Sequence, residues 1–262
     1  MTNKHMAQKQ LYKYGYSFEE IEKQISKPEK QEKPWGSFCR AVNEEIYGMD
    51  QVIVKQGKMA ILDPKDYQGK EVLLYLESGK IQIGEYCLIP EDTLFFPLGA
   101  LPSSPEIKAE EDSILYIFFG WPQKDGEKTV KQATTFDIRH KDYAENLIET
   151  IANREFTGKK IFFKTGNHHG LHFHCKKTET YFMHSGKLLL RLRADNAEDR
   201  YYVLEPGQTI RITPGLMHQA SGLADPVIIE SSTHDEDSDS FIVESEFAEM
   251  PKLKEMINKI NN

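Results

Sequence analysis

Short apolar runs that alternate with turn residues dominate the hydrophobic pattern of this 262-residue chain. Between Trp35 and Trp121 the runs occupy residues 51–54, 58–62, 71–76, 80–83 and 113–119. From Lys159 the rhythm resumes, with runs at residues 160–164, 171–174, 180–184, 187–192, 201–204, 208–212 and 227–230. Runs of this length, bounded by turn residues at regular spacing, predict an antiparallel all-β sandwich or barrel.

Three segments have helical features instead. Residues 17–25 open on a capping box, residues 141–154 have helical periodicity, and residues 251–260 suit a terminal helix. Residues 27–34 are charged and bounded by prolines, which indicates an extended connector. We therefore expect an N-terminal helical segment and connector (1–34), a first β domain (35–135), and a second β domain with a preceding and a terminal helix (136–262).

Composition narrows the class of protein. The net charge is −8 with 28% charged residues, and Lys and Arg are dispersed, which argues against nucleic acid or an anionic membrane as the main partner. Cys39, Cys87 and Cys175 are an odd number at unrelated spacings, so no disulfide framework is implied. The N-terminal residues lack the apolar core of a secretory signal, and no run approaches the ~18 apolar residues that span a bilayer. We expect a soluble, cytoplasmic protein whose partner is a small molecule.

The candidate chemistry is concentrated in residues 166–186. His172 and His174 are two residues apart, so on a strand both imidazoles project from one face. Glu179 can return to that face from the next stretch of chain, and His218 follows a Pro-Gly turn further on. Three neutral imidazoles and a carboxylate suit one divalent ion such as Mn, Fe, Co, Ni or Zn. On a six-coordinate ion they would leave positions open for a substrate.

Two further residues are candidates for catalysis. Tyr181 continues the inward-facing positions from Glu179, where it could hydrogen-bond a substrate or fill the interior. Glu230 ends an apolar run, and burying its carboxylate unpaired would be costly. It could serve as a general base beside the metal, or it could pair with Arg211 or Arg191.

Other polar residues near the cluster are expected to have structural or solvent-facing positions. His168 and His169 lie in a turn next to glycine, which favours a solvent-facing loop. His184 is five residues from Glu179, so a regular strand directs it away from the metal. Lys164 and Lys177 could contact an anion at the mouth of the pocket, but solvated lysines are the default expectation.

The two β-rich stretches also resemble each other. Residues 202–212 are similar to residues 86–96, and residues 185–190 to residues 78–83. A period of a little over one hundred residues indicates two copies of one domain. On this alignment the counterparts of the four candidate ligands are Lys65, Tyr67, Val72 and Pro102. Only the tyrosine could bind a metal, so the first copy is predicted to lack one.

The spacing of these residues resembles a known family. Gly166-x5-His172-x-His174-x4-Glu179-x6-Gly186 matches the first cupin motif at each fixed position. The second motif is looser: Gly207, Gly215 and His218 are in register, but Thr213 replaces the usual proline and Gly222 the usual asparagine. The resemblance implies a bicupin of two double-stranded β-helix (jelly-roll) barrels with short flanking helices, and metal in the second barrel only.

Shorter matches point toward sugars. Residues 35–37 and 174–186 are similar to segments of cupin phosphomannose isomerases, and residues 230–241 resemble a segment of cupin D-lyxose isomerases. They imply a metal-dependent aldose–ketose isomerase of carbohydrate metabolism, which acts through an enediolate. Glu230 is then the best candidate for the base and Glu179 the second. Two alternatives stay open, a non-haem metal dioxygenase and a sugar-binding cupin without turnover. Exposed edge strands could pair two chains into a homodimer.

Overall fold

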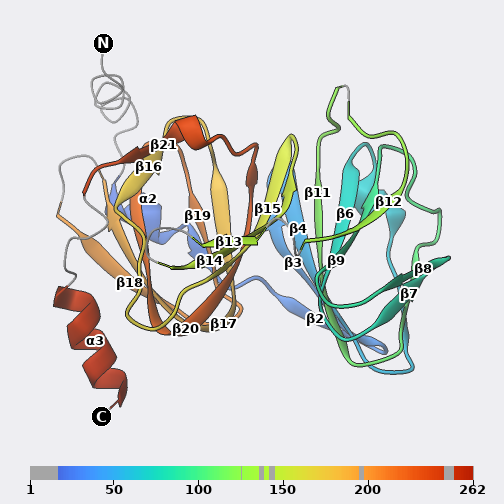
Figure 1. The fold of residues 1–262 in the computed structure, drawn as a ribbon, viewed down its shortest axis with the longest axis horizontal. Helices are drawn as coiled ribbons and strands as arrows, with labels where there is room; N and C mark the ends of the chain where they lie inside the picture. The colour runs from blue at the N-terminus through green and yellow to red at the C-terminus, as the bar shows by residue number, and fades with distance from the viewer. Residues whose placement is uncertain are drawn as a thin grey trace. The chain divides into compact units, whose positions relative to one another are not determined.

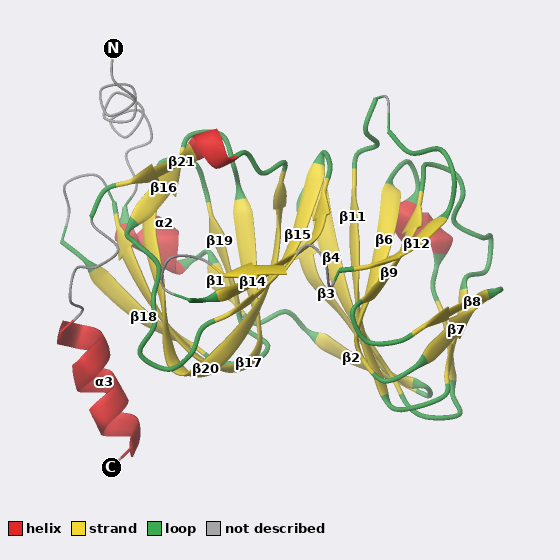
Figure 2. Ribbon diagram, viewed as in Figure 1, coloured by secondary structure: helices red, strands yellow, loops and turns green. Residues whose placement is uncertain are grey.

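The computed structural model describes residues 17–124, 126–135, 139–141, 145–194, 198–244 and 251–261. Strands dominate these residues, which confirms the all-β prediction (Figures 1 and 2). The chain divides into two compact units. The first unit comprises residues 28–139 and 149–158, and the second unit comprises residues 1–27, 140–148 and 159–262. No helix in the described part is long and apolar enough to cross a membrane.

The first unit consists of two antiparallel sheets. Its elements are β2 (Lys30–Lys33), β3 (Gly36–Asn43), β4 (Tyr47–Val54), β5 (Met59–Ile61), η1 (Pro64–Tyr67), β6 (Glu71–Ser78), β7 (Ile81–Ile83), β8 (Tyr86–Leu88), β9 (Asp92–Phe96), β10 (Glu106–Ala109), β11 (Ser113–Gly120) and β12 (Lys131–Thr134). The strand orders are β12-β9-β6-β11-β4-β3-β2 and β5-β10-β7-β8. Alternate residues of these strands, such as Leu74 and Ile117, point into one apolar core.

The second unit contains the remaining elements. They are α2 (Phe18–Glu22), β1 (Ile25–Ser26), β13 (Arg139–Lys141), β14 (Leu147–Asn153), β15 (Phe156–Phe162), β16 (His172–His174), β17 (Glu179–Arg193), β18 (Arg200–Leu204), β19 (Thr209–Ile212), β20 (Met217–Thr233), η3 (Asp237–Asp239), β21 (Ser240–Ile242) and α3 (Pro251–Asn261). Strands β13, β14 and β15 each include residues of the first unit. The sheet order is β1-β19-β17-β20-β15-β14-β13, with β16 between β20 and β21 and with β18 beside β17.

The predicted helices had different outcomes. Helix α2 begins at the expected capping box, in which Ser17 and Glu20 bond each other's backbone N–H groups. Helix α3 covers the predicted terminal helix. The helix predicted over residues 141–154 was wrong, because residues 147–153 form strand β14; residues 142–144 of that prediction lie outside the described residues. The β-branched residues Ile148, Thr150 and Ile151 suit a strand that has neighbours to pair with, and tertiary pairing outweighs the helical pattern.

Gly186 lies at an irregularity in the pairing of the two long strands β17 and β20. The runs at 180–184 and 187–192, predicted as separate strands, form the single strand β17, whose pairing with β20 shifts register between Met183 and Leu188. Gly186 has a φ of 73°, and a Cβ atom there would lie 2.3 Å from the carbonyl oxygen of Ala224. Only glycine fits this irregularity, which explains the conformational need for the last glycine of the motif.

Candidate metal centre

Three neighbouring strands of the second unit bring the candidate ligands together. His172 in β16 is directly opposite His218 in β20, and Glu179 opens β17, which pairs with the other end of β20. One ring nitrogen from each of His172, His174 and His218 lies within 4.8 Å of the others. In the described part of the chain, no other group of three or more histidine, cysteine or acidic side chains meets this geometry. The three histidines therefore form one compact group, and Glu179 lies beside it, with Oε1 2.8 Å from His218 Nε2 and Oε2 3.8 Å from His174 Nε2.

Backbone carbonyl groups determine which nitrogen of each imidazole is free. Nδ1 of all three rings faces a carbonyl oxygen: His172 faces Gly170 at 3.0 Å, His174 faces Asp239 at 3.1 Å, and His218 faces Leu216 at 3.1 Å. A carbonyl oxygen can only accept, so Nδ1 donates and Nε2 retains its lone pair. A hydrogen bond of this kind from the far nitrogen is how proteins orient histidine ligands of metals.

The contact between Glu179 and His218 indicates whether the site suits a cation. Glu179 Oε1 lies 2.8 Å from His218 Nε2, yet both atoms are buried and neither has a hydrogen-bond partner. With the proton of His218 on Nδ1, both atoms are acceptors and would repel each other. A cation bound to both would resolve this conflict, because it would attract both lone pairs. The donor set thus suits one divalent ion.

The pKa shifts of the candidate ligands favour the protonation states that bind a cation. Burial, together with neighbouring imidazoles, lowers the pKa of His172 well below its usual value. Burial also lowers the pKa of His174, against the attraction of Glu179. For Glu179, burial raises the pKa, but the opposing charges around it, Lys177 first, hold the pKa well below its ordinary value. Neutral imidazoles and an ionised carboxylate are the forms that bind metal.

Lys177 differs most from its sequence-based prediction. It was expected to be solvated, but its side chain is only 4% exposed. Its ammonium group lies 2.7 Å from Glu179 Oε2, 2.7 Å from Glu230 Oε1 and 2.9 Å from Asp235 Oδ1. These carboxylates raise its pKa well above the usual value despite its burial. Lys177 is therefore part of the cluster.

Asp239 holds the loop that carries Lys177. Its carboxylate accepts backbone N–H groups from Cys175, Lys176 and Lys177, each at 3.0 Å. Its carbonyl oxygen accepts from His174 Nδ1. Sequence reasoning missed both Asp239 and Asp235, which lie in the acidic stretch 235–239. The only available signal was an acidic run in the tail that follows the β20 strand.

Glu230 and Tyr181 both lie in the interior next to the ligands. Glu230 is 2% exposed, and its predicted partners Arg211 and Arg191 are replaced by Lys177 and by Ser232, whose hydroxyl donates to Oε1 at 3.1 Å. Tyr181 is opposite Glu230 in the β17–β20 pairing and is 3% exposed. Burial and the carboxylates of Glu179 and Glu230 raise the pKa of Tyr181 well above its usual value.

The other histidines lie around the cluster or away from it. His169 was expected in a solvent-facing loop, but its ring packs 4.6 Å from that of His172, and its Nε2 accepts the N–H of Ala220 at 3.2 Å. Burial and the nearby His218 lower its pKa to about 3. His168 contacts the backbone of His169 in the same turn, and His184 is half-buried in β17. Both nitrogens of His169 are bonded, so it supports the ligands without adding a donor.

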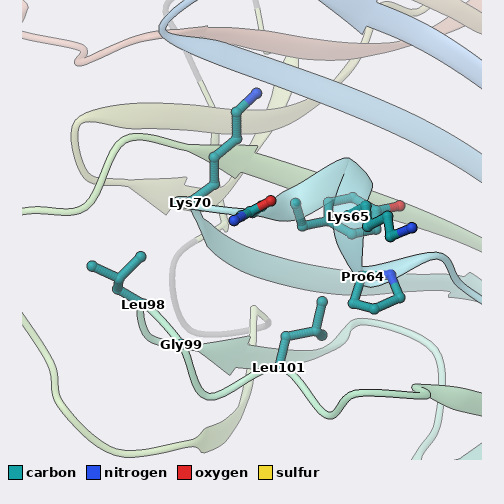
Figure 3. A pocket seen from close by; sticks show the side chains of 9 residues that line it. Pro64, Lys65, Lys70, Leu98, Gly99 and Leu101 are labelled. Carbon is teal, nitrogen blue, oxygen red and sulfur yellow. The ribbon is translucent and has the colours of Figure 1, made fainter.

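The residues that the sequence alignment matches to the histidine ligands have different surroundings in the first unit. A cavity of about 320 Å³ there is lined by Lys65 and Tyr67, the counterparts of His172 and His174, together with Lys70 and Leu98 (Figure 3). Tyr67 donates a hydrogen bond to Asp50 at 2.6 Å, and Arg40 pairs with both oxygens of that carboxylate. The described lining residues include no histidine, cysteine or carboxylate.

Comparisons with known proteins identify the fold. No family model matches the chain, and no curated protein matches it. Among solved structures, it is similar to oxalate decarboxylase from Lactobacillus farciminis in complex with formate, with a TM-score of 0.64 and 11% identity over 84% of this chain and 88% of that chain. It is also similar to a mutant of the oxalate decarboxylase from Bacillus subtilis, with a TM-score of 0.64 and 12% identity over 89% of this chain and 83% of that chain.

A third similar structure concerns the Mn(II) centres of the Bacillus subtilis oxalate decarboxylase, with a TM-score of 0.62 and 10% identity over 84% of this chain and 79% of that chain. Oxalate decarboxylases are cupin-superfamily proteins, and at these identities the likeness establishes the fold alone. The chain has a cupin fold, and it carries three histidines arranged to hold one divalent metal ion.

Proposed function

We propose that this protein is a metal-dependent cupin enzyme that interconverts an aldose and a ketose. The observation that supports the proposal most directly is a second buried carboxylate, Glu230, beside the ligand Glu179. Aldose–ketose isomerisation moves a proton between adjacent carbon atoms, so it needs a base next to the group that polarises the carbonyl. Residues His172, His174, Glu179 and His218 would hold the metal.

A divalent ion held by these residues would polarise the substrate carbonyl and stabilise the negative charge that develops on oxygen. Glu230 is our candidate for the base. Both of its partners in the described residues, Lys177 and Ser232, bind Oε1, which leaves Oε2 to take the proton from C2 and return it to C1. Glu179 is a weaker candidate, because Lys177 engages its Oε2 and its Oε1 faces the imidazoles.

Tyr181 would orient the substrate. Its hydroxyl is buried among the carboxylates and stays protonated, so it would turn from Glu179 to donate a hydrogen bond to a sugar oxygen. The many hydrogen-bonding groups around the site favour a hydroxylated substrate over an apolar one. The similar solved structures are oxalate decarboxylases, whose substrate is also a small molecule but a dicarboxylate, so the choice of a sugar rests on the site residues alone.

The test is a screen of metal-loaded protein against pentoses, hexoses and their phosphates in D2O. We expect ketose formation and deuterium incorporation at C2, both reduced about 100-fold or more in Glu230→Gln. Absence of isomerisation and of exchange across the panel would reject the proposal. Tight sugar binding that persists in Glu230→Gln, without any product, would indicate a sugar-binding cupin without turnover.

A second candidate is metal-dependent oxidative chemistry or decarboxylation of a small carboxylic acid. The similar solved structures are oxalate decarboxylases, and three histidines with a glutamate also suit reactions with O2. Formate release from oxalate, or substrate-dependent oxygen uptake, would favour this candidate over the isomerase.

Two structural proposals accompany the functional one. We propose that each unit is one cupin barrel and that the first barrel has no catalytic metal, consistent with the ion-paired Asp50 in it. A homodimer could form through β18, an edge strand paired only with β17 in the described sheet, where Tyr201 and Val203 are exposed. Size-exclusion chromatography with light scattering, on wild type and on Val203→Lys, tests the dimer.

A further inference from the structure

Lys177 sits at the centre of a buried network of charges. Its three ammonium hydrogens face three carboxylates, those of Glu179, Glu230 and Asp235, at 2.7 to 2.9 Å. An ammonium group has three donors, so this one is saturated and none remains for a substrate. Lys177 therefore does not act as an anion-binding residue at the pocket mouth.

The network joins the metal ligand to the candidate base. Lys177 binds Oε2 of Glu179, which leaves Oε1 as the oxygen that faces His218 Nε2. The same ammonium group binds Oε1 of Glu230. One cation thus orients the ligand carboxylate toward the imidazoles and holds the second carboxylate beside it.

The backbone around Lys177 is also held by hydrogen bonds. The loop between β16 and β17 donates three N–H groups to Asp239, and the next residue, Thr178, donates its N–H to Thr233 Oγ1 at 3.1 Å. These bonds direct the side chain inward, so that its charge is permanently present at the site.

The formal charges of the network show how the ammonium group of Lys177 changes the net charge of the site. The carboxylates of Glu179, Glu230 and Asp235 face two ammonium groups, Lys177 and Lys159, the latter bonded to Asp235 at 2.5 Å. The five groups together carry one negative charge, which a divalent ion converts to one positive charge. Without Lys177, the loaded network would be neutral.

We propose that Lys177 is a positioning residue that confines Glu179 to binding the metal through one oxygen and keeps the loaded site positively charged, at the expense of metal affinity. A positive loaded site favours the negative charge that develops on a bound substrate. The proposal rests on the metal centre proposed above and not on the isomerase reaction.

The test measures Mn²⁺ affinity by calorimetry in variants that change the formal charge of the network. In Lys177→Met, repulsion between the ammonium group and the ion is lost, and we expect Mn²⁺ to bind about tenfold more tightly. In Glu230→Gln, one attractive charge is lost, and we expect binding about tenfold weaker. The double variant has the same formal charge as wild type, so its affinity should return to within about threefold of the wild-type value.

A residue with a merely structural role would give a different order, since each variant would weaken binding and the double variant would weaken it most. Unchanged or weaker Mn²⁺ binding by folded Lys177→Met would overturn the proposal. Should that variant fail to fold by circular dichroism, the double variant decides: affinity near wild type supports the proposal, and a tenfold loss overturns it. Failure of wild type to bind Mn²⁺ rejects the metal centre as well, whereas the expected order without sugar turnover rejects only the isomerase.

Discussion

Asp50 of the first unit and Glu179 of the second are both carboxylates buried next to a cation, but their oxygens are used differently. Both oxygens of Asp50 are bonded, by Arg40 and by the hydroxyl of Tyr67. Glu179 has one oxygen bonded to Lys177, while the other faces an imidazole lone pair without a hydrogen-bond partner. The unsatisfied oxygen is what sets Glu179 apart from the saturated carboxylate of Asp50 and makes it our proposed ligand.

The surroundings of the two carboxylates also shift their pKa values in opposite directions. Burial raises the pKa of Asp50 to about 6, in spite of Arg40 and Tyr67. At Glu179, burial has the same effect, but the opposing charges around it, Lys177 first, hold the pKa well below its ordinary value. The first unit thus stabilises its fold with a saturated pair, whereas the second holds an ionised carboxylate available to a metal.

The largest difference between the two units should appear when a proposed metal ligand is removed. His218→Ala should reduce Mn²⁺ affinity more than about 100-fold, because loss of a ligand exceeds the ~10–100-fold cost of losing a residue that only supports a ligand. Elemental analysis after dialysis measures the metal content. His168→Ala, which removes a histidine from the turn before β16, is the matched control and should retain the metal. Full metal content in His218→Ala would contradict the assignment.

In the first unit, loss of the cation Arg40 should lower the free energy of unfolding and leave metal affinity unchanged. Arg40→Met leaves Asp50 buried without its ion pair and should lower the free energy of unfolding by about 3 kcal/mol. Tyr67→Phe removes one hydrogen bond to the same carboxylate and should cost about 2 kcal/mol. Both tryptophans of the chain, Trp35 and Trp121, belong to the first unit, so their fluorescence during urea unfolding reports on it.

Metal affinity provides the control for these two variants. Mn²⁺ binding should stay within about twofold of wild type in Arg40→Met, since the pair belongs to the first unit and does not touch the ligands. Metal loss without a change in stability would show that the carboxylate of the first unit is not structural.

The smallest expected effect is an opposite response of the two units to acid in metal-free protein. His169 has a folded-state pKa of about 3, so its unfolded form takes up a proton below about pH 6.5 and the folded form does not. Acidification from pH 7 to 5 should therefore destabilise the second unit by about 2 kcal/mol for each such imidazole. Asp50 has a raised folded-state pKa, so its cost to stability shrinks as pH falls through 6, and the first unit should gain about 1 kcal/mol.

Urea unfolding of chelator-treated protein at pH 7 and 5 separates the two effects, with tryptophan fluorescence for the first unit and far-ultraviolet circular dichroism for the whole chain. Two probes that shift together in the same direction would contradict the comparison.

Several features of the fold and site could be predicted from local sequence. Alternating apolar runs predicted most strands, because a strand with one buried face needs that pattern. The four candidate ligands could be proposed because His172 and His174 share a strand face and the glycines around them mark turns. The capping box at Ser17 was also readable, since its two bonds join residues three positions apart.

Other features depended on contacts between distant residues. The helix predicted over residues 141–154 was wrong because the sheet supplies strand neighbours that outweigh the local periodicity. Lys177 reads as an ordinary surface lysine until Asp235 and Glu230, more than fifty residues away in the chain, are brought to its ammonium group. His169 likewise lies in a glycine-flanked turn, yet packs against the ligands.

The sequence by itself determined the all-β class and the residues proposed as ligands, because strand spacing and residue chemistry are local properties. Only the tertiary structure decided which nitrogen of each imidazole is free, how Glu179 is oriented and which cation accompanies it. Those properties are set by the carbonyl groups of Gly170, Leu216 and Asp239 and by the burial of Lys177. A charge buried among distant partners has no signature in the local pattern, since its free energy depends on groups that only folding brings within a few ångströms.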